Sequence, residues 1–396
     1  MVSKLLSIIF LFIILTGCGQ AYKKLHRDAV VVDTHNDVMI SILEGHNIEH
    51  DLSAKTHSDI NRFKKGGVDV QIFSIWSDER YGKGTGFNYA NRQIDSLYAI
   101  ADRNPGKLMI VKTPQELAQA VAQKKLGVMM GMEGGHMIED RLNYLDSLYK
   151  RGVRYMTLTW NNSTSWATSA ADETSSHTST QKKGLNEFGE EVVRRMNELG
   201  MLVDLSHAGE QTFYDALRIT SKPVIVSHSC VYSLCPHRRN LKDDQIKAIA
   251  KNGGVIHLNF YSRFLDSSYE KRKDQFILLH KSELDSLQKL KWQGFEIDMW
   301  ASKKYPAEVQ HLRPPFSVII DHLDYLVKMA GIDHVGLGSD FDGIESTPLG
   351  MNDVTDMPAI TKALLAKGYS KKDIKKILGE NFIRIFEAAQ NTTNNK

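Results

Sequence analysis

The sequence predicts a single α/β domain built as a (β/α)8 barrel of the TIM type. Apolar runs rich in Val, Ile and Met recur along the chain and alternate with stretches of amphipathic helical pattern. This alternation is typical of parallel strands covered by helices. Ionisable residues directly follow several runs, where the active site of such a barrel lies. Eight runs are predicted as strands: 29–33, 68–75, 127–132, 154–159, 201–205, 223–227, 254–258 and 334–338.

Four clear helices are predicted between and after these strands, at 184–199, 242–251, 316–329 and 371–389. With 396 residues, of which 42% are hydrophobic and 24% charged, the chain can bury a large core. The stretch 266–315, between the seventh and eighth strands, is long for a βα connection and predicts a helical insertion over the barrel mouth. We expect this insertion to be either a lid, or a solvated decoration or oligomer contact.

The charge pattern argues against a nucleic-acid partner. The formal net charge of +3 is spread along the chain and is not gathered in one basic block. A small-molecule substrate is therefore expected. Cys230 and Cys235 have no His or Cys partners at zinc-finger spacing, and nothing in the sequence requires a disulfide between them.

The N-terminus has the pattern of an export signal. Lys4 precedes an apolar run over 5–15 that is too short for an ordinary membrane span. The following Leu15-Thr16-Gly17-Cys18 resembles the bacterial lipobox, in which the Cys becomes the lipidated first residue. The alternative is a plain secretory signal with an incidental Cys. We expect a lipoprotein anchored in the cell envelope, on the periplasmic or outer-membrane side, with four parts: signal peptide 1–17, lipidated anchor and linker 18–27, catalytic barrel 28–390 and polar tail 391–396.

Residues of the types that bind metal ions directly follow five of the predicted strands. The first strand ends in His35 and Asp37, which point to the same side because they are two residues apart. Further candidates follow the third, fifth, sixth and eighth strands: Glu133, His207, His228 and Asp340. A lone His beside an apolar run is more often structural, but strand ends filled repeatedly with such residues favour a shared site.

This set of ligands is sufficient for two divalent ions. Zinc fits imidazole and carboxylate ligands best, although iron, manganese or cobalt could also occupy the site. Glu133 is expected to bridge the ions, since its two oxygens can hold metals ~3.5–4 Å apart. The alternative role for Glu133 is helix capping. The adjacent Gly134-Gly135 favours the crowded site, because glycine permits close approach of the backbone.

Six segments together resemble the membrane dipeptidase (renal dipeptidase) family of the amidohydrolase superfamily, in the same order and over about residues 28–389. They are Asp33-Thr-His-Asn-Asp37, Met132-Glu-Gly-Gly-His136, Val203-Asp-Leu-Ser-His207, Val226-Ser-His-Ser229, Arg238-Arg239-Asn240 and Gly338-Ser-Asp-Phe-Asp-Gly343. The resemblance implies a metal-dependent dipeptidase in which His35 and Asp37 bind the first zinc, His207 and His228 the second, and Glu133 both.

The resemblance also implies roles for substrate-handling residues. Asp340 corresponds to the catalytic carboxylate, with Asp342 as its decoy. Arg239 corresponds to the arginine that holds the substrate carboxylate, a task suited to a planar guanidinium, although Arg238 or a merely surface role is the alternative. Tyr261 is a further candidate substrate contact, since it follows the seventh strand; aromatic residues there are often only core.

One position departs from the family. Trp160 stands where the family usually has a substrate-contacting histidine after the fourth strand. Indole can donate a hydrogen bond but cannot accept one or carry a proton. We expect altered selectivity or rate, with the missing polar contact supplied by Asn161, Asn162 or His177.

The resemblance implies dipeptide substrates, including those with a D-residue at the C-terminal position. In the expected mechanism, metal-activated hydroxide attacks the scissile carbonyl, and Asp340 passes the proton of the water to the leaving amine. Two rival hypotheses are another amidohydrolase, such as a lactonase or deaminase, and a catalytically impaired lipoprotein that binds peptides. The sequence leaves a homodimer open.

Overall fold

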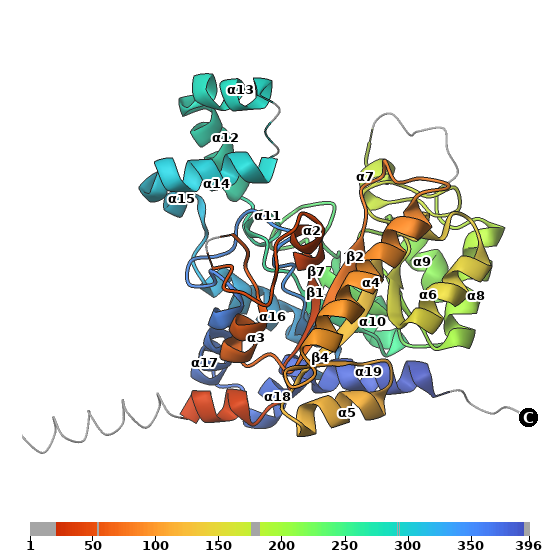
Figure 1. The fold of residues 1–396 in the computed structure, drawn as a ribbon. Coiled ribbons are helices and arrows are strands. Elements are labelled where there is room, and N and C mark those ends of the chain that lie inside the picture. The colour runs from red at the N-terminus through yellow and green to blue at the C-terminus, as the bar shows by residue number, and fades with distance from the viewer. Residues whose placement is uncertain (1–20, 54, 176–182, 291, 293, 392–396) are drawn as a thin grey trace, which may run out of the picture.

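The computed structural model describes residues 21–53, 55–175, 183–290, 292 and 294–391. In these parts of the chain, parallel strands form one sheet in the order β1-β2-β4-β5-β6-β7-β8-β9. A parallel bridge from Asn36 to Phe341, just after β9, brings the two edges together into a nearly closed barrel (Figure 1). The predicted TIM-type barrel is confirmed. Its strands are β1 Val32–Asn36, β2 Val70–Trp76, β4 Leu126–Glu133, β5 Val153–Thr157, β6 Leu202–Asp204, β7 Ile225–Ser229, β8 Val255–Leu258 and β9 Val335–Leu337.

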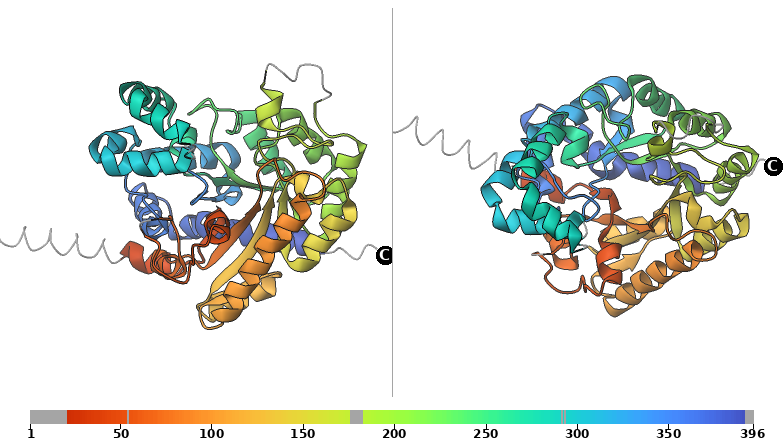
Figure 2. Two further views of the ribbon diagram at one scale, coloured as in Figure 1. Left: turned by 45° about the horizontal axis from the view of Figure 1, so that its top comes forward. Right: turned by 90° about the horizontal axis from the view of Figure 1, so that it is seen from above.

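Helices surround this barrel on its outer face (Figure 2). A helical segment over 21–27 comes before β1. The labelled helices up to β8 are α2 Val38–Leu43, α3 Ile60–Gly66, α4 Gly86–Arg103, α5 Pro114–Ala122, α6 Leu142–Arg151, α7 Ala170–Glu173, α8 Glu187–Leu199, α9 Glu210–Ile219 and α10 Asp243–Asn252. Those after β8 and outside the insertion are α11 Ser262–Leu265, α16 Ser317–Ala330, α17 Pro358–Ala366, α18 Lys371–Lys375 and α19 Asn381–Gln390. No helix in the described parts is both long and apolar enough to cross a membrane.

Two elements differ from the prediction. A short strand, β3 Leu108–Ile110, pairs with β4 outside the barrel path and was missed, because three residues give too short a pattern to detect. The helix predicted at 371–389 is interrupted between α18 and α19 by a π-helical turn, Lys376–Glu380. A Cβ on Gly379 would lie 2.4 Å from the carbonyl oxygen of Val30, so glycine permits this turn to pack directly on the chain entering β1.

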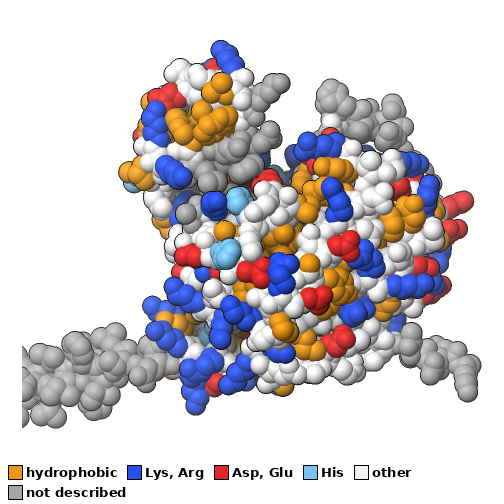
Figure 3. Space-filling view, in the orientation of Figure 1, with side chains coloured by type: hydrophobic (Ala, Val, Ile, Leu, Met, Phe, Trp, Pro, Cys, Tyr) orange, Lys and Arg blue, Asp and Glu red, His pale blue; other side chains and the backbone are white. Residues whose placement is uncertain are grey.

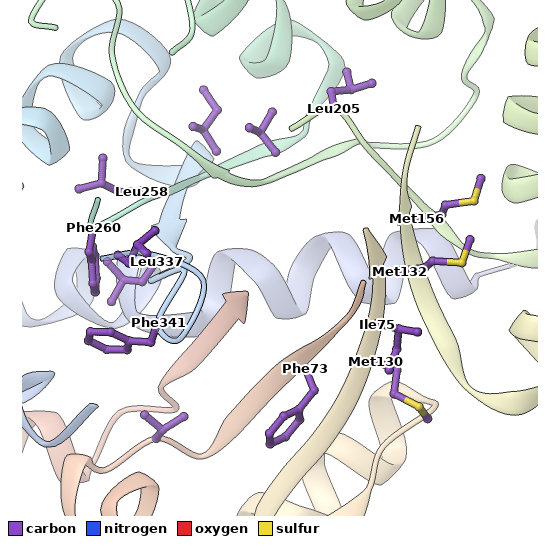
Figure 4. Packing of buried hydrophobic residues seen from close by; sticks show 14 of the residues in the cluster. Phe73, Ile75, Met130, Met132, Met156, Leu205, Leu258, Phe260, Leu337 and Phe341 are labelled. Atoms are coloured by element: carbon purple, nitrogen blue, oxygen red, sulfur yellow. The ribbon is translucent and has the colours of Figure 1, made fainter. Parts of the chain in front are cut away.

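The strands place alternate side chains in two apolar clusters. On β2, Val70 and Ile72 belong to a cluster at the beginnings of the strands, whereas Phe73 and Ile75 belong to the larger cluster shown in Figure 4. In the smaller cluster the strands pack against α19, which runs across the end of the barrel opposite the mouth (Figure 1). That end of the barrel is therefore closed and apolar.

The predicted insertion between the last two barrel strands is helical. Its helices are α12 Tyr269–Leu279, α13 Lys281–Lys289, α14 Gly294–Lys304 and α15 Pro306–Leu312. Seen from above, they lie over one side of the barrel (Figure 2). In the space-filling view they project beyond the rest of the surface, with a hollow between them and the opposite rim (Figure 3). The mouth therefore stays open beside the insertion, and a role as lid stays a prediction.

Candidate functional site

The ends of the barrel strands bring the five predicted ligands into one buried cluster. One oxygen of Glu133, Oε1, lies 2.9 Å from His207 Nε2 and 3.4 Å from His228 Nε2. The other, Oε2, lies 3.5 Å from His35 Nε2, which is itself 3.4 Å from Asp37 Oδ2. Glu133 thus faces two groups of ligand atoms, one with each oxygen.

The predicted catalytic carboxylate joins this cluster on the side of β1. One ligand atom from each of His35, Asp37 and Asp340 lies within 4.8 Å of the other two. Asp340 accepts a hydrogen bond from Asn259 Nδ2 at 2.7 Å. A Cβ on Gly343 would lie only 2.2 Å from Asp37 Oδ2, so glycine is needed there to leave room for the carboxylates. Burial and the nearby charge of Asp37 raise the pKa of Asp340 well above its ordinary value, which favours a carboxyl that can take up a proton.

Hydrogen bonding fixes the tautomer of His35. The hydroxyl of Tyr155 donates to the carbonyl oxygen of Thr34 at 3.0 Å, so its oxygen accepts from His35 Nδ1, 2.8 Å away. The proton of the neutral ring is therefore on Nδ1, and Nε2 presents a lone pair. That Nε2 atom is buried and has no hydrogen-bond partner. A buried, unpartnered lone pair pointing at two carboxylates fits a metal ligand.

The other two imidazoles are held in the same tautomer. Ser227 Oγ donates to a carboxylate oxygen of Asp204 at 2.6 Å and so accepts from His228 Nδ1 at 2.8 Å. His207 Nδ1 lies 3.2 Å from the amide oxygen of Asn161, which can only accept. All three rings consequently present Nε2 lone pairs toward Glu133 or its neighbours.

The electrostatics of the cluster favour a bound cation. Burial and the nearby guanidinium of Arg239 lower the pKa of His207 to about 4, and burial lowers the pKa of His228 well below its ordinary value. Both rings are therefore neutral near pH 7, as ligands must be. Lone pairs 2.9–3.5 Å apart repel unless positive charge lies between them. Ligands held ~2 Å from one ion have about this spacing, so the residues present fit divalent metal ions.

The two adjacent arginines are clearly distinguished. Arg239 is buried, and it donates to Ser229 Oγ at 3.2 Å and to the carbonyl oxygen of His228 at 3.0 Å. Its Nε is buried and has no hydrogen-bond partner. Arg238 is exposed. Both line a cavity of about 280 Å³ that His207 also borders, but only Arg239 is buried.

Trp160 also lies beside the cluster, with its ring centroid 6.5 Å from that of His207. The rings of Trp160 and Trp76 form a T-shaped pair, with centroids 5.0 Å apart. Trp76 lies opposite Glu133 in the register of β2 and β4, and it lines a larger cavity of about 610 Å³ with Tyr81 and others. The sequence analysis missed Trp76, although its place at the end of a predicted strand was a usable signal.

Two further predicted residues have their partners elsewhere. Tyr261 packs its ring on Phe264, with centroids 4.9 Å apart, and its hydroxyl lies beside the side chain of Glu345. Its role as a substrate contact stays a prediction. The carboxylate of Asp342 accepts hydrogen bonds from the backbone N–H of His57 and the hydroxyl of Ser58, so it is a structural neighbour of Asp340.

The cysteine predictions have different outcomes. Cys230 and Cys235 are buried and free. Cys18 lies outside the described residues, as do His177 and positions 392–396 of the predicted tail.

The family model described as membrane dipeptidase (peptidase family M19) matches residues 20–396. The chain is 30% identical over 392 residues to a protein of Schizosaccharomyces pombe described as an uncharacterized dipeptidase, covering 94% of this chain and 83% of that one.

Two solved structures superpose on most of this chain. A family M19 metallopeptidase, dipeptidase AC, superposes with a TM-score of 0.75 at 25% identity and covers 91% of this chain and 98% of its own. A metallopeptidase from Rhodobacter sphaeroides, solved with a phosphinate mimic of the dipeptide L-Ala-D-Ala, superposes with a TM-score of 0.73 at 24% identity, over 91% of this chain and 99% of that one.

Proposed function

The chain belongs to the membrane dipeptidase family and is a metallo-dipeptidase, and from this premise we propose that it uses two zinc ions to hydrolyse dipeptides, including those with a C-terminal D-residue. The observation that carries the proposal is the position of Glu133, whose two oxygens face two separate groups of ligand atoms. The phosphinate mimic bound by the Rhodobacter sphaeroides enzyme has a D-residue at its C-terminal position, which supports the substrate class.

In this proposal the ligands divide into two sets. His35 and Asp37 would hold one ion, His207 and His228 would hold the other, and Glu133, which faces both groups of ligand atoms, would be shared between them. When bound, such ions supply Lewis-acid activation of a water molecule and of a carbonyl group. Zinc is proposed because imidazole and carboxylate ligands suit it, with manganese, iron and cobalt as the alternatives for direct analysis.

Asp340 is proposed to move the proton. Its carboxyl lies in the cluster beside Asp37, and its raised pKa matches a group that accepts a proton during attack and returns it to the leaving amine. The hydrogen bond from Asn259 Nδ2 to Oδ2 fixes one oxygen and leaves Oδ1 free to make the transfer. The buried position keeps bulk water from competing for this proton.

Arg239 is proposed to hold the substrate carboxylate. It has donors in a rigid plane, and its buried Nε has no partner in the protein. Existing bonds to Ser229 and to the His228 carbonyl orient the guanidinium toward the cavity beside His207. Trp160 and Tyr261 are proposed as further substrate contacts.

The first experiment is a metal-dependent assay of the protein beginning after Cys18. Release of free amino acids is measured from L-Ala-L-Ala, L-Ala-D-Ala and the C-terminal amide of each, with the enzyme zinc-loaded, chelated and reloaded. Cleavage of the free acids that chelation abolishes and zinc restores supports the proposal, and loss of cleavage with the amides supports Arg239. Absence of cleavage by protein that holds two metal ions would overturn the substrate assignment.

We further propose that Cys18 is lipidated and anchors the enzyme in the cell envelope. The support is the sequence pattern at 15–18, which lies outside the described residues. Membrane fractionation of the full chain tests it: the wild type is expected with the membranes and Cys18→Ser in the soluble fraction.

A homodimer is also proposed, and light scattering of the soluble form measures its mass.

A further inference from the structure

The loop after β5 holds the backbone of His207. This residue has a left-handed backbone conformation, with φ of 62°, which is unfavourable for residues other than glycine. Its carbonyl oxygen accepts two hydrogen bonds from the loop, one from Thr159 Oγ1 at 3.2 Å and one from the N–H of Ala170 at 2.8 Å. These bonds fix where His207 lies but leave the rotation and the tautomer of its ring undetermined.

Asn161 in the same loop supplies the missing restraint. Its amide oxygen lies 3.2 Å from His207 Nδ1, and its own backbone carbonyl accepts a hydrogen bond from Ser169 Oγ at 2.7 Å. The backbone that carries this side chain is therefore itself held in place. Neighbouring Asn162 does not do this: its amide nitrogen reaches the carbonyl of Ser163 at 3.5 Å, and its Oδ1 is buried without a partner.

We infer that Asn161 is a positioning residue, which accepts the Nδ1 proton of His207 and thereby keeps the Nε2 lone pair of that ring directed at the site of the second metal ion. The inference rests on the proposed function, because it takes His207 as a ligand. The inference also explains why the partner of His207 is Asn161 and not Trp160. The indole of Trp160 has no acceptor, so the hydrogen bond to His207 comes from the next residue.

The Nδ1 atoms of the two other imidazoles have partners that can be compared with Asn161. His35 and His228 each have Nδ1 bonded to a hydroxyl, at 2.8 Å in both cases, and each hydroxyl donates to a further acceptor. Asn161 replaces the hydroxyl with an amide oxygen, which needs no further acceptor because it carries no proton. Outer partners of this kind change metal affinity by 10–100-fold in other proteins.

The test measures binding of the two ions separately. In the full-length enzyme, Asn161→Leu removes the acceptor at similar volume, Asn161→Asp keeps an acceptor, and Asn162→Leu is the matched control. Competition with a chromophoric chelator should show one of the two ions bound ~10–100-fold more weakly in Asn161→Leu, with the other unchanged. Asn161→Asp should restore the affinity and Asn162→Leu should resemble the wild type. Equal affinities in Asn161→Leu and the wild type would overturn the inference.

A second measurement needs no variant. The ¹⁵N chemical shifts of the imidazole rings in the zinc-loaded wild type report which nitrogen carries the proton. The inference requires His207 to carry it on Nδ1, and a proton on Nε2 overturns it even if Asn161→Leu fails to fold. Wild-type protein that binds no metal at either site would instead contradict the proposed function, so the two failures are distinguishable.

Discussion

The two ends of the barrel are formed by the same strands but differ in chemistry. At the closed end, first residues of strands such as Val32 and Ile225 pack against Phe382 and Phe386 of α19, and all are at most 2% exposed. At the mouth, the same strands end in buried carboxylates and imidazoles. Apolar burial stabilises the fold, whereas buried like charges cost free energy without a counter-charge. Stability and chemistry should therefore respond to different substitutions.

The largest expected effect is on turnover, from Asp340→Asn at the mouth. Asn tolerates the left-handed φ of 62° at this position and keeps an oxygen for the bond from Asn259. The variant should fold and bind both ions, while kcat falls by ~10²–10⁴-fold because no proton can be transferred. Dipeptide hydrolysis and metal analysis on the same sample measure this. Asp342→Asn, on the same loop, is the control and should keep its turnover per folded molecule.

The opposite behaviour is expected at the closed end, from Phe386→Ala. This side chain is fully buried between α19 and the strands. Its removal leaves a cavity and should lower the free energy of unfolding by ~3–5 kcal/mol, as measured by denaturant titration of chelated protein. Phe386→Leu should cost less. Turnover per folded, metal-loaded molecule should stay at the wild-type level, and a parallel fall in kcat would show that the two ends are coupled.

Acidification should act on the fold through histidines outside the cluster. His322 of α16 accepts from the N–H of Val231 at 3.2 Å and donates to the carbonyl of Leu265 at 3.0 Å, so its neutral form is required. Burial lowers its pKa from 6.5 to about 4. The stability that it contributes is present above pH 6.5 and is lost as the pH falls toward 4.

For one such histidine the decrease in the free energy of unfolding is ~3 kcal/mol at most. Unfolding titrations of chelated protein at pH 7 and pH 4.5 should show this decrease in the wild type. His322→Gln keeps an acceptor and a donor but cannot be protonated, so its stability should fall less over the same range. An identical fall in both proteins would remove His322 from the acid response.

The contrast between the two ends also explains what the sequence could predict. Buried parallel strands give continuous apolar runs, so each barrel strand was located, and the ligand candidates were found because they directly follow those runs. Glu133 and Trp76 come together only through the register of β2 and β4, which periodicity does not specify. Gly379 was not detected as the site of the π-helical turn, because the reason for that turn is the distant Val30.

The roles of the residues that orient the imidazoles were not predicted, for the same reason. Tyr155, Asn161 and Ser227 bond to His35, His207 and His228, and the first two of these contacts join segments 120 and 46 residues apart. Nothing in a local pattern marks a tyrosine or an asparagine as such a partner. A sequence therefore reveals ligand types at strand ends more readily than the hydrogen bonds that select their tautomers.

Tyr155 is the residue at which the two ends meet, so its substitution is the finest test of the comparison. Its ring belongs to the apolar cluster of the closed end and is 1% exposed, while its hydroxyl bonds to His35 among the candidate metal ligands. A Cβ on Gly131 would lie 2.0 Å from this ring, which shows how closely the ring is packed. Tyr155→Phe should keep that packing and remove the hydroxyl, which accepts from His35 Nδ1 and donates to the carbonyl of Thr34.

The variant is expected to lose both metal affinity and stability. The ion proposed at His35 and Asp37 should bind ~10-fold more weakly, because His35 is free to adopt the other tautomer. The free energy of unfolding of the chelated protein should fall by ~1–3 kcal/mol, because the hydroxyl makes two hydrogen bonds. Unchanged metal affinity with a large loss of stability would mean that the hydroxyl serves the fold alone, and that the mouth does not depend on the closed end through this residue.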